Sequence, residues 1–202
     1  MDGVLFEGDN FWLDLHRKFR TATLGTRLAK KYLKSNYELL VENVAGKLWK
    51  GKSAHIYEEL VAKRRYHPGV KEVFEFIKLN KIKSAILSSG PYDLAKRAQN
   101  ELGIDVIYAN RLMIKNEKIK GKVDVMVEDS EKANIGKKIA KKMNIDLSNV
   151  AFIGDTDSDV ELSEQVGLPI AYNSNSILLK KVCKYSINYG ELRNLIKILQ
   201  SN

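Results

Sequence analysis

A short apolar segment that ends in an acidic turn places the strongest limit on the fold of this chain. Residues 150–153 read Val-Ala-Phe-Ile with no polar residue between them, and Gly154 then leads into Asp155. A strand that is apolar on both faces is typical of a parallel sheet covered by helices on both sides. In such sheets, ligands bind at the carboxyl ends of the strands. The segment therefore predicts an α/β fold with a polar site directly after this strand.

Strand and helix patterns alternate through the C-terminal two thirds of the chain, which predicts a doubly wound parallel sheet. Residues 109–126 interrupt this order, because they alternate around a turn and predict a β-hairpin within the core. The predicted strands are 84–87, 106–108, 150–153, 168–171 and 185–187, and the predicted helices are 70–79, 93–102, one from 132, 159–166, 177–182 and 192–199.

Residues 11–67 carry helical patterns only. Phe11, Leu15 and Phe19 recur every four residues, as they would on one face of a helix, and similar patterns continue to Val61. The aromatic side chains are best interpreted as the core of this helical unit. We therefore expect a helical cap at 11–67, inserted into a core domain made of residues 1–10 and 68–202.

The turn after residues 150–153 carries several carboxylates. Asp155 and Asp159 offer hard oxygen donors, and Mg²⁺ is usually held by one or two carboxylates, with water and substrate phosphate in the remaining positions. A second interpretation is a turn that caps the helix starting near Ser158, because Asp is common at helix N-termini. The turn alone does not decide between a metal site and a helix cap.

Four segments, taken in chain order, resemble the four motifs of the haloacid dehalogenase superfamily of phosphotransferases. They are the opening loop at Asp2, the strand end at Ser88, the helix start at Lys132 and the Gly-Asp-x-x-x-Asp turn from Gly154. The resemblance implies a Rossmann-type core, an Mg²⁺ cofactor and phosphoryl transfer through an aspartyl-phosphate. Residues 11–67 look like the small helical cap of one subclass of that superfamily.

The resemblance also implies roles for the acidic residues. Asp2 would protonate the leaving oxygen and then activate the attacking water, while its main-chain carbonyl coordinates Mg²⁺. Asp155 would bind the metal directly, and Asp159 would bind it through water or orient that shell.

Three further residues would hold the phosphate, again by resemblance. Ser88 and the amide of Ser89 would bind one phosphate oxygen, and Lys132 would bind another while it keeps the carboxylates from repelling one another. Taken alone, Lys132 has the simpler interpretation of a surface lysine. Its position between the second and fourth motifs favours the catalytic role.

The nucleophile of that superfamily is the first aspartate of the opening loop, and it would stand one position before Met1. The strand that carries it would lie at the centre of the sheet. Its absence would leave main-chain groups of neighbouring strands unpaired, at ~1–3 kcal/mol for each buried group. We therefore expect Met1 to be an internal methionine of a longer gene product, or the start of a truncated form. We expect the polypeptide of 202 residues to be inactive or nearly so.

Within the superfamily, residues 88–90, 109–112 and 167–173 look like those of the phosphoserine phosphatase branch. There, a glutamate shortly after the first motif and an arginine from the cap grip the amino acid. The matching early position here holds Asp9, and the arginine has no evident counterpart in the sequence. Phosphoserine is therefore one candidate among small phosphorylated metabolites, with Asp9 as a candidate substrate-binding residue. The oligomeric state stays open.

Other function classes also have to be weighed. The net charge of +9 suggests nucleic-acid binding as a function of a different class. However, the lysines lie in pairs on amphipathic helical segments, which is typical of solvated faces and argues against that function.

The apolar runs are too short for a membrane span, and no secretory pattern opens the chain, so we expect a cytoplasmic protein. Two alternatives stay open: a phosphotransferase that passes the group to an alcohol, and a non-catalytic protein that binds Mg²⁺ or a phosphorylated ligand.

Overall fold

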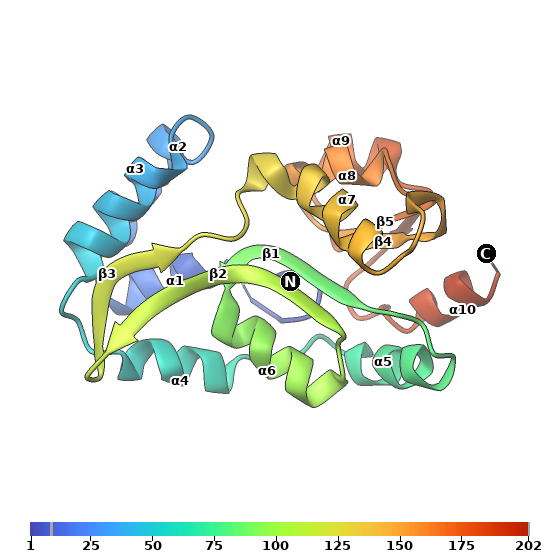
Figure 1. Ribbon diagram of the computed structural model, residues 1–202, viewed down its shortest axis with the longest axis horizontal. Helices are drawn as coiled ribbons and strands as arrows, with labels where there is room; N and C mark the ends of the chain where they lie inside the picture. Colours follow the sequence, from blue (N-terminus) through green and yellow to red (C-terminus); the bar gives the residue numbers. More distant parts are fainter. Residues whose placement is uncertain (9, 202) are drawn as a thin grey trace.

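The computed structural model describes residues 1–8 and 10–201, and it confirms the predicted α/β fold (Figure 1). Strands and helices alternate from residue 70 onward, with short 3-10 turns between them. In chain order the elements are α5 (Val70–Leu79), β1 (Ala85–Pro91), α6 (Tyr92–Leu102), β2 (Val106–Lys115), β3 (Lys118–Asp124), η2 (Asp129–Glu131), α7 (Lys132–Lys142), η3 (Leu147–Asn149), β4 (Ala151–Gly154), η4 (Asp157–Asp159), α8 (Val160–Ser163), β5 (Leu168–Tyr172), α9 (Ile177–Val182), β6 (Tyr185–Ile187) and α10 (Asn194–Gln200).

Every named element within residues 11–63 is a helix, as the sequence pattern predicts, although Ser53 also makes an isolated β-bridge with Lys118 of β3. The buried indole of Trp49 stacks on Trp12 with ring centroids 5.9 Å apart, and it also contacts His16 and Phe19. The aromatic side chains therefore form the core of this region. Its elements are α1 (Phe11–Lys18), α2 (Ala22–Tyr32), α3 (Tyr37–Val41), the π-helix η1 (Glu42–Trp49) and α4 (His55–Lys63).

The strands form two separate sheets of three strands each. One has the order β1-β2-β3 and the other β4-β5-β6. Pairing is parallel between β1 and β2 and throughout the second sheet, whereas β2 and β3 form an antiparallel hairpin. The short strand predicted at 106–108 and the first strand of the hairpin are thus one continuous strand, β2. Among the described residues, β1 and β4 each have one edge without a paired strand.

The prediction that residues 150–153 form a fully buried strand is wrong. All five residues of β5 are buried, whereas Ala151, Phe152 and Ile153 in β4 are only half-buried. The difference arises because β4 has a neighbour on one side only, while β5 lies between two strands.

The opening segment packs into the main hydrophobic core instead of extending into solvent. Val4, Leu5 and Phe6 are buried, and the ring of Phe6 stacks on Tyr66 at 4.6 Å between centroids. The main-chain amide of His67 donates to the carbonyl of Leu5. These contacts fix residues 1–6 beside the return from α4 to α5. Among the described residues, no helix is both long enough and apolar enough to cross a membrane.

Candidate active site

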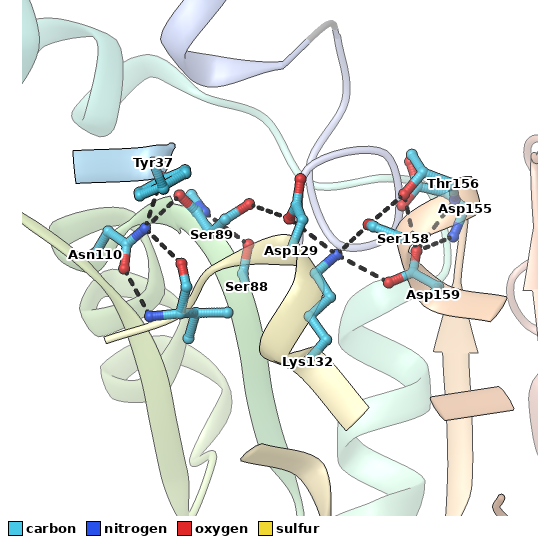
Figure 2. Close-up of polar contacts among 12 residues, drawn as sticks. Tyr37, Ser88, Ser89, Asn110, Asp129, Lys132, Asp155, Thr156, Ser158 and Asp159 are labelled. Carbon is cyan, nitrogen blue, oxygen red and sulfur yellow. Dashed lines mark hydrogen bonds and ion pairs between the residues drawn. The ribbon is translucent and has the colours of Figure 1, made fainter. Parts of the chain in front are cut away.

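Lys132 is the first residue of α7, and its ammonium group is buried among side chains of neighbouring turns (Figure 2). Its Nζ lies 3.0 Å from Asp159 Oδ1 and donates to Ser158 Oγ at 2.7 Å. Asp129, one turn earlier, lies 3.6 Å from the same nitrogen. Burial alone would lower the pKa of Lys132, but the carboxylates of Asp159 and Asp129 outweigh burial and raise it. Lys132 is therefore a buried cation with fixed partners, and the interpretation as a surface lysine is wrong.

Asp159 closes the turn that follows β4. Its Oδ2 accepts the main-chain N–H groups of Asp155 at 3.0 Å and Thr156 at 3.1 Å. A Cβ on Gly154 would lie 2.5 Å from the Cβ of Asp159, so glycine is required at the end of the strand. Burial raises the pKa of Asp159, but Lys132 and the two amides outweigh burial and lower it below its usual value. The capping interpretation of this turn thus applies to Asp159, because both of its oxygens have protein donors.

The carboxylate of Asp155 has fewer positively charged and N–H partners than that of Asp159. Burial raises the pKa of Asp155 to about 6, and the nearby carboxylates of Asp159 and Asp2 act in the same direction. The N-terminal amine and Lys132 act against them. On its other side Asp155 lies against Gly3, where a Cβ would come within 2.2 Å of Oδ2. A divalent cation would supply the missing positive charge.

Asp2 lies at the same place and is held by main-chain and cap groups. Its Oδ2 accepts the N–H of Phe11 at 3.1 Å, and its Oδ1 lies 3.7 Å from Nη2 of Arg64. That Oδ1 is buried without a hydrogen-bond partner. Burial raises the pKa of Asp2, against the lowering effects of the N-terminal amine and the Phe11 amide. Arg64, at the end of α4, is also paired with Asp14 of α1.

The three predicted metal ligands, Asp2, Asp155 and Asp159, gather in one region. In the part of the chain that is described, however, no three His, Cys, Asp or Glu side chains lie close enough to form a metal site by themselves. This arrangement suits Mg²⁺, which keeps several water ligands and needs only one or two carboxylates. Oδ1 of Asp2 has no hydrogen-bond partner, although Arg64 lies 3.7 Å away, and burial together with the nearby carboxylates raises the pKa of Asp155, so a bound cation would favour the ionised form of Asp155.

The predicted phosphate-binding residues Ser88 and Ser89 lie within β1 and not after it, at the irregular pairing with β2 between Leu87 and Pro91, and they reach the same region. Ser88 is buried, and its Oγ accepts the N–H of Gly90 at 3.1 Å, which leaves its hydroxyl hydrogen for another acceptor. Ser89 donates its hydroxyl to Asp129 Oδ1 at 2.8 Å. A Cβ on Gly90 would lie 2.9 Å from Cε of Met1. Ser88, Ser89 and Lys132 therefore surround one corner of the site, and the opening segment borders it.

Several polar residues of the site were not predicted from the sequence. Asn110 is completely buried and binds both Ser89 and Val127. Asp129 could have been found from its spacing of three residues before Lys132 on a predicted helix start. Arg64 could not, because it lies in a basic run that is typical of a solvated face. The predicted substrate-binding residue Asp9 lies outside the described residues.

The chain is similar to known proteins in both sequence and fold. The sequence profile of the haloacid dehalogenase-like hydrolases matches residues 1–164. A phosphoserine phosphatase of Archaeoglobus fulgidus is 34% identical over 164 residues, which are 81% of this chain and 47% of that protein. A phosphoserine phosphatase of Methanocaldococcus jannaschii is 31% identical over 136 residues, 65% of this chain and 63% of that protein. The match thus spans less than two thirds of either relative.

Solved structures share the fold. A substrate-bound phosphoserine phosphatase complex superposes with a TM-score of 0.83 at 24% identity, over 98% of this chain and 94% of that chain. A phospho-aspartyl intermediate analogue of phosphoserine phosphatase superposes with a TM-score of 0.82, also at 24% identity, over 98% of this chain and 95% of that chain.

Proposed function

Because this chain belongs to the haloacid dehalogenase-like hydrolase family, we propose that it provides the site of an Mg²⁺-dependent phosphatase for a small phosphomonoester. The observation that carries the proposal is the buried ammonium of Lys132, fixed by Asp159 and Asp129 beside the hydroxyl of Ser89. A cation held rigidly among carboxylates costs little further reorganisation when a phosphate dianion arrives.

Each residue has a separate task in this proposal. The hydroxyl of Ser88, the amide of Ser89 and the ammonium of Lys132 hold the phosphate oxygens. Asp2 holds a proton for the leaving oxygen, and its raised pKa favours the protonated form that a general acid needs. The amide of Phe11 keeps that carboxyl in place.

Asp155 and the main-chain carbonyl of Asp2 would hold Mg²⁺, and Asp159 would act through the turn that it closes or through a metal-bound water. When bound, the ion supplies positive charge next to the phosphate oxygens. The raised pKa of Asp155, caused first by burial and then by the carboxylates of Asp159 and Asp2, supports this assignment, because a bound cation would favour the ionised form.

The nucleophile in this proposal is an aspartate one position before Met1, at the end of an added strand. Two observations support its placement. The edges of β1 and β4 are both open, and the opening segment touches the ends of both strands, through Met1 at Gly90 and through Gly3 at Asp155. A strand that ends there would pair with β1 and β4 and would deliver its last carboxylate beside Asp2. We accordingly propose that the polypeptide of 202 residues has little or no turnover.

A hydrolysis assay tests the function. The chain, extended upstream by an apolar strand that ends in aspartate, is expected to release phosphate from p-nitrophenyl phosphate with Mg²⁺ and to stop in excess chelator. Added ethylene glycol should leave the phosphate yield unchanged, whereas a phosphotransferase would form a new phosphate ester. Tight binding of Mg²⁺ and phosphate without any turnover would favour a binding protein instead, and full activity in excess chelator would exclude the Mg²⁺ mechanism.

Asp155→Asn tests the metal assignment. We expect Mg²⁺ to bind ~10–100-fold more weakly, because the amide removes the charged ligand while it keeps the shape of the side chain. Isothermal titration with Mg²⁺ measures the change on the chain of 202 residues. Asp157→Asn is the matched control on the same turn, since its Oδ1 accepts the hydroxyl of Ser176. Equal Mg²⁺ affinity of Asp155→Asn and the unchanged protein would contradict the assignment.

The substrate is proposed to be small, with phosphoserine as the first candidate. The similarity to phosphoserine phosphatases supports it, and a lid of helices over a site admits only small ligands. A screen of phosphomonoesters on the extended chain should show turnover of small esters and none of a folded phosphoprotein. Asp9→Ala should weaken phosphoserine preference if Asp9 contacts the amino acid. Efficient dephosphorylation of the phosphoprotein would refute the role given to the helices.

A further inference from the structure

Tyr37 reaches the site from the helical region. It is the first residue of α3, and its phenol is half-buried. Its hydroxyl oxygen lies 3.1 Å from Nδ2 of Asn110, a buried residue of β2. Figure 2 shows Tyr37 and Asn110 on the opposite side of Ser89 from Lys132. The hydroxyl therefore lies near the phosphate corner but away from the cation that would hold the phosphate.

The orientation of the Asn110 side chain is fixed by its surroundings. Its Oδ1 accepts the main-chain N–H groups of Met126 and Val127, both at 2.9 Å. The other end of the amide is therefore the NH₂ group, which can only donate. Three oxygens lie within reach of that nitrogen: the carbonyl of Val127 at 2.8 Å, the hydroxyl of Tyr37 at 3.1 Å and the carbonyl of Ser89 at 3.2 Å.

The hydroxyl hydrogen of Tyr37 has no acceptor on the side chain of Asn110. An NH₂ group has two hydrogens, and the two carbonyl oxygens can use both. The hydroxyl of Tyr37 can only accept from Asn110, because Nδ2 has no lone pair to offer. The hydroxyl hydrogen of Tyr37 thus finds no acceptor at Asn110, the one hydrogen-bond partner found for Tyr37 among the described residues.

The surroundings keep this hydrogen on the oxygen. Burial raises the pKa of Tyr37 to about 12, and the nearby carboxylates of Asp129 and Glu128 add to the effect, although the bond from Asn110 opposes it. The hydroxyl of Tyr37 is therefore neutral at pH 7 and can donate a hydrogen bond. A neutral hydroxyl can donate to an oxygen acceptor in a substrate. The position of Tyr37 favours an oxygen of the leaving group over one of the phosphate.

We propose that Tyr37 is a substrate-contacting residue, whose hydroxyl donates to an oxygen on the leaving group of the phosphomonoester. The proposal rests on the proposed function, because it requires the phosphate to bind at Ser88, Ser89 and Lys132. It makes the start of α3 a determinant of specificity. Esters that carry an oxygen acceptor a few bonds from the phosphate would bind more tightly than inorganic phosphate does.

Tyr37→Phe tests the proposal cleanly, because it removes only the hydroxyl and leaves Asn110 with two carbonyl acceptors for two hydrogens. The melting temperature should therefore stay unchanged. Titrations with O-phospho-L-serine and with inorganic phosphate, both in Mg²⁺, should show phosphoserine binding about five- to tenfold more weakly, the usual range for one neutral hydrogen bond. Phosphate affinity should not change. Tyr32→Phe, in the same helical region, is the matched control and should alter neither affinity.

The outcomes separate the two proposals. Unchanged phosphoserine affinity in Tyr37→Phe would overturn the role of Tyr37, and so would equal weakening of phosphoserine and phosphate, since the contact would not then be to the leaving group. Absence of binding of both ligands to the unchanged protein would overturn the proposed function, and with it the contact.

Discussion

Lys132→Ala is expected to lower phosphatase turnover by ~10²–10³-fold in the upstream-extended chain, the usual effect of losing one preorganised electrostatic contact. The ammonium is fixed by Asp159 and Asp129 before any substrate arrives. Its removal takes away the charge that balances both the phosphate and these carboxylates. Steady-state kinetics on p-nitrophenyl phosphate measure the change.

Stability has to be followed in the same experiment, because Lys132 is buried. Breaking a buried ion pair by removing one partner typically costs ~3–5 kcal/mol in the free energy of unfolding. Rates are therefore compared below the melting temperature of the variant. Lys137→Ala, an exposed position on the same helix, should change neither rate nor stability. A folded Lys132→Ala variant with unchanged turnover would show that Lys132 has only a structural role.

A still larger loss is expected at the position before Met1. In the upstream-extended chain, changing the final aspartate of the added strand to asparagine should lower turnover by roughly 10⁴-fold or more, the scale seen when a covalent nucleophile is removed. Asparagine keeps the strand and its pairing, so the variant should melt like the aspartate form. Any difference in rate then reports the carboxylate and not the fold.

The polypeptide of 202 residues completes this comparison. It should match the asparagine variant in turnover but melt at a lower temperature, because the edges of β1 and β4 stay open. Equal turnover of the 202-residue and the aspartate forms would refute the proposed nucleophile. Equal melting temperatures would refute the proposed strand position.

Much of the fold could be predicted because its signals are local. The apolar run before Gly154 and the glycine-to-aspartate turn each depend on a few adjacent residues, and the helical period of residues 11–67 repeats within single helices. The half-buried state of β4 was not predictable from its own residues. It depends on whether a second strand lies beside it, which is a property of the whole sheet.

The sequence also indicated which residues of the candidate site would lie near one another, although their roles stay predictions. Lys132 and Asp155 stand at a helix start and just after a strand end, and the order of the motifs singles them out together with Ser88, which lies within β1. The bond between Asn110 and Tyr37 joins residues 73 positions apart, and no periodicity in the sequence links them. Arg64 is similar, because its partner Asp14 lies 50 positions earlier in the chain. Such contacts follow only from the packing of the helical region against the core.

The two open strand edges also affect how the polypeptide of 202 residues behaves at high concentration. An unpaired edge offers a row of main-chain donors and acceptors to any other extended chain. In β4 that edge is accompanied by the half-buried side chains of Phe152 and Ile153, which an incoming strand could cover further. We therefore expect the polypeptide of 202 residues to self-associate through these edges more readily than a form in which a further strand pairs with β1 and β4.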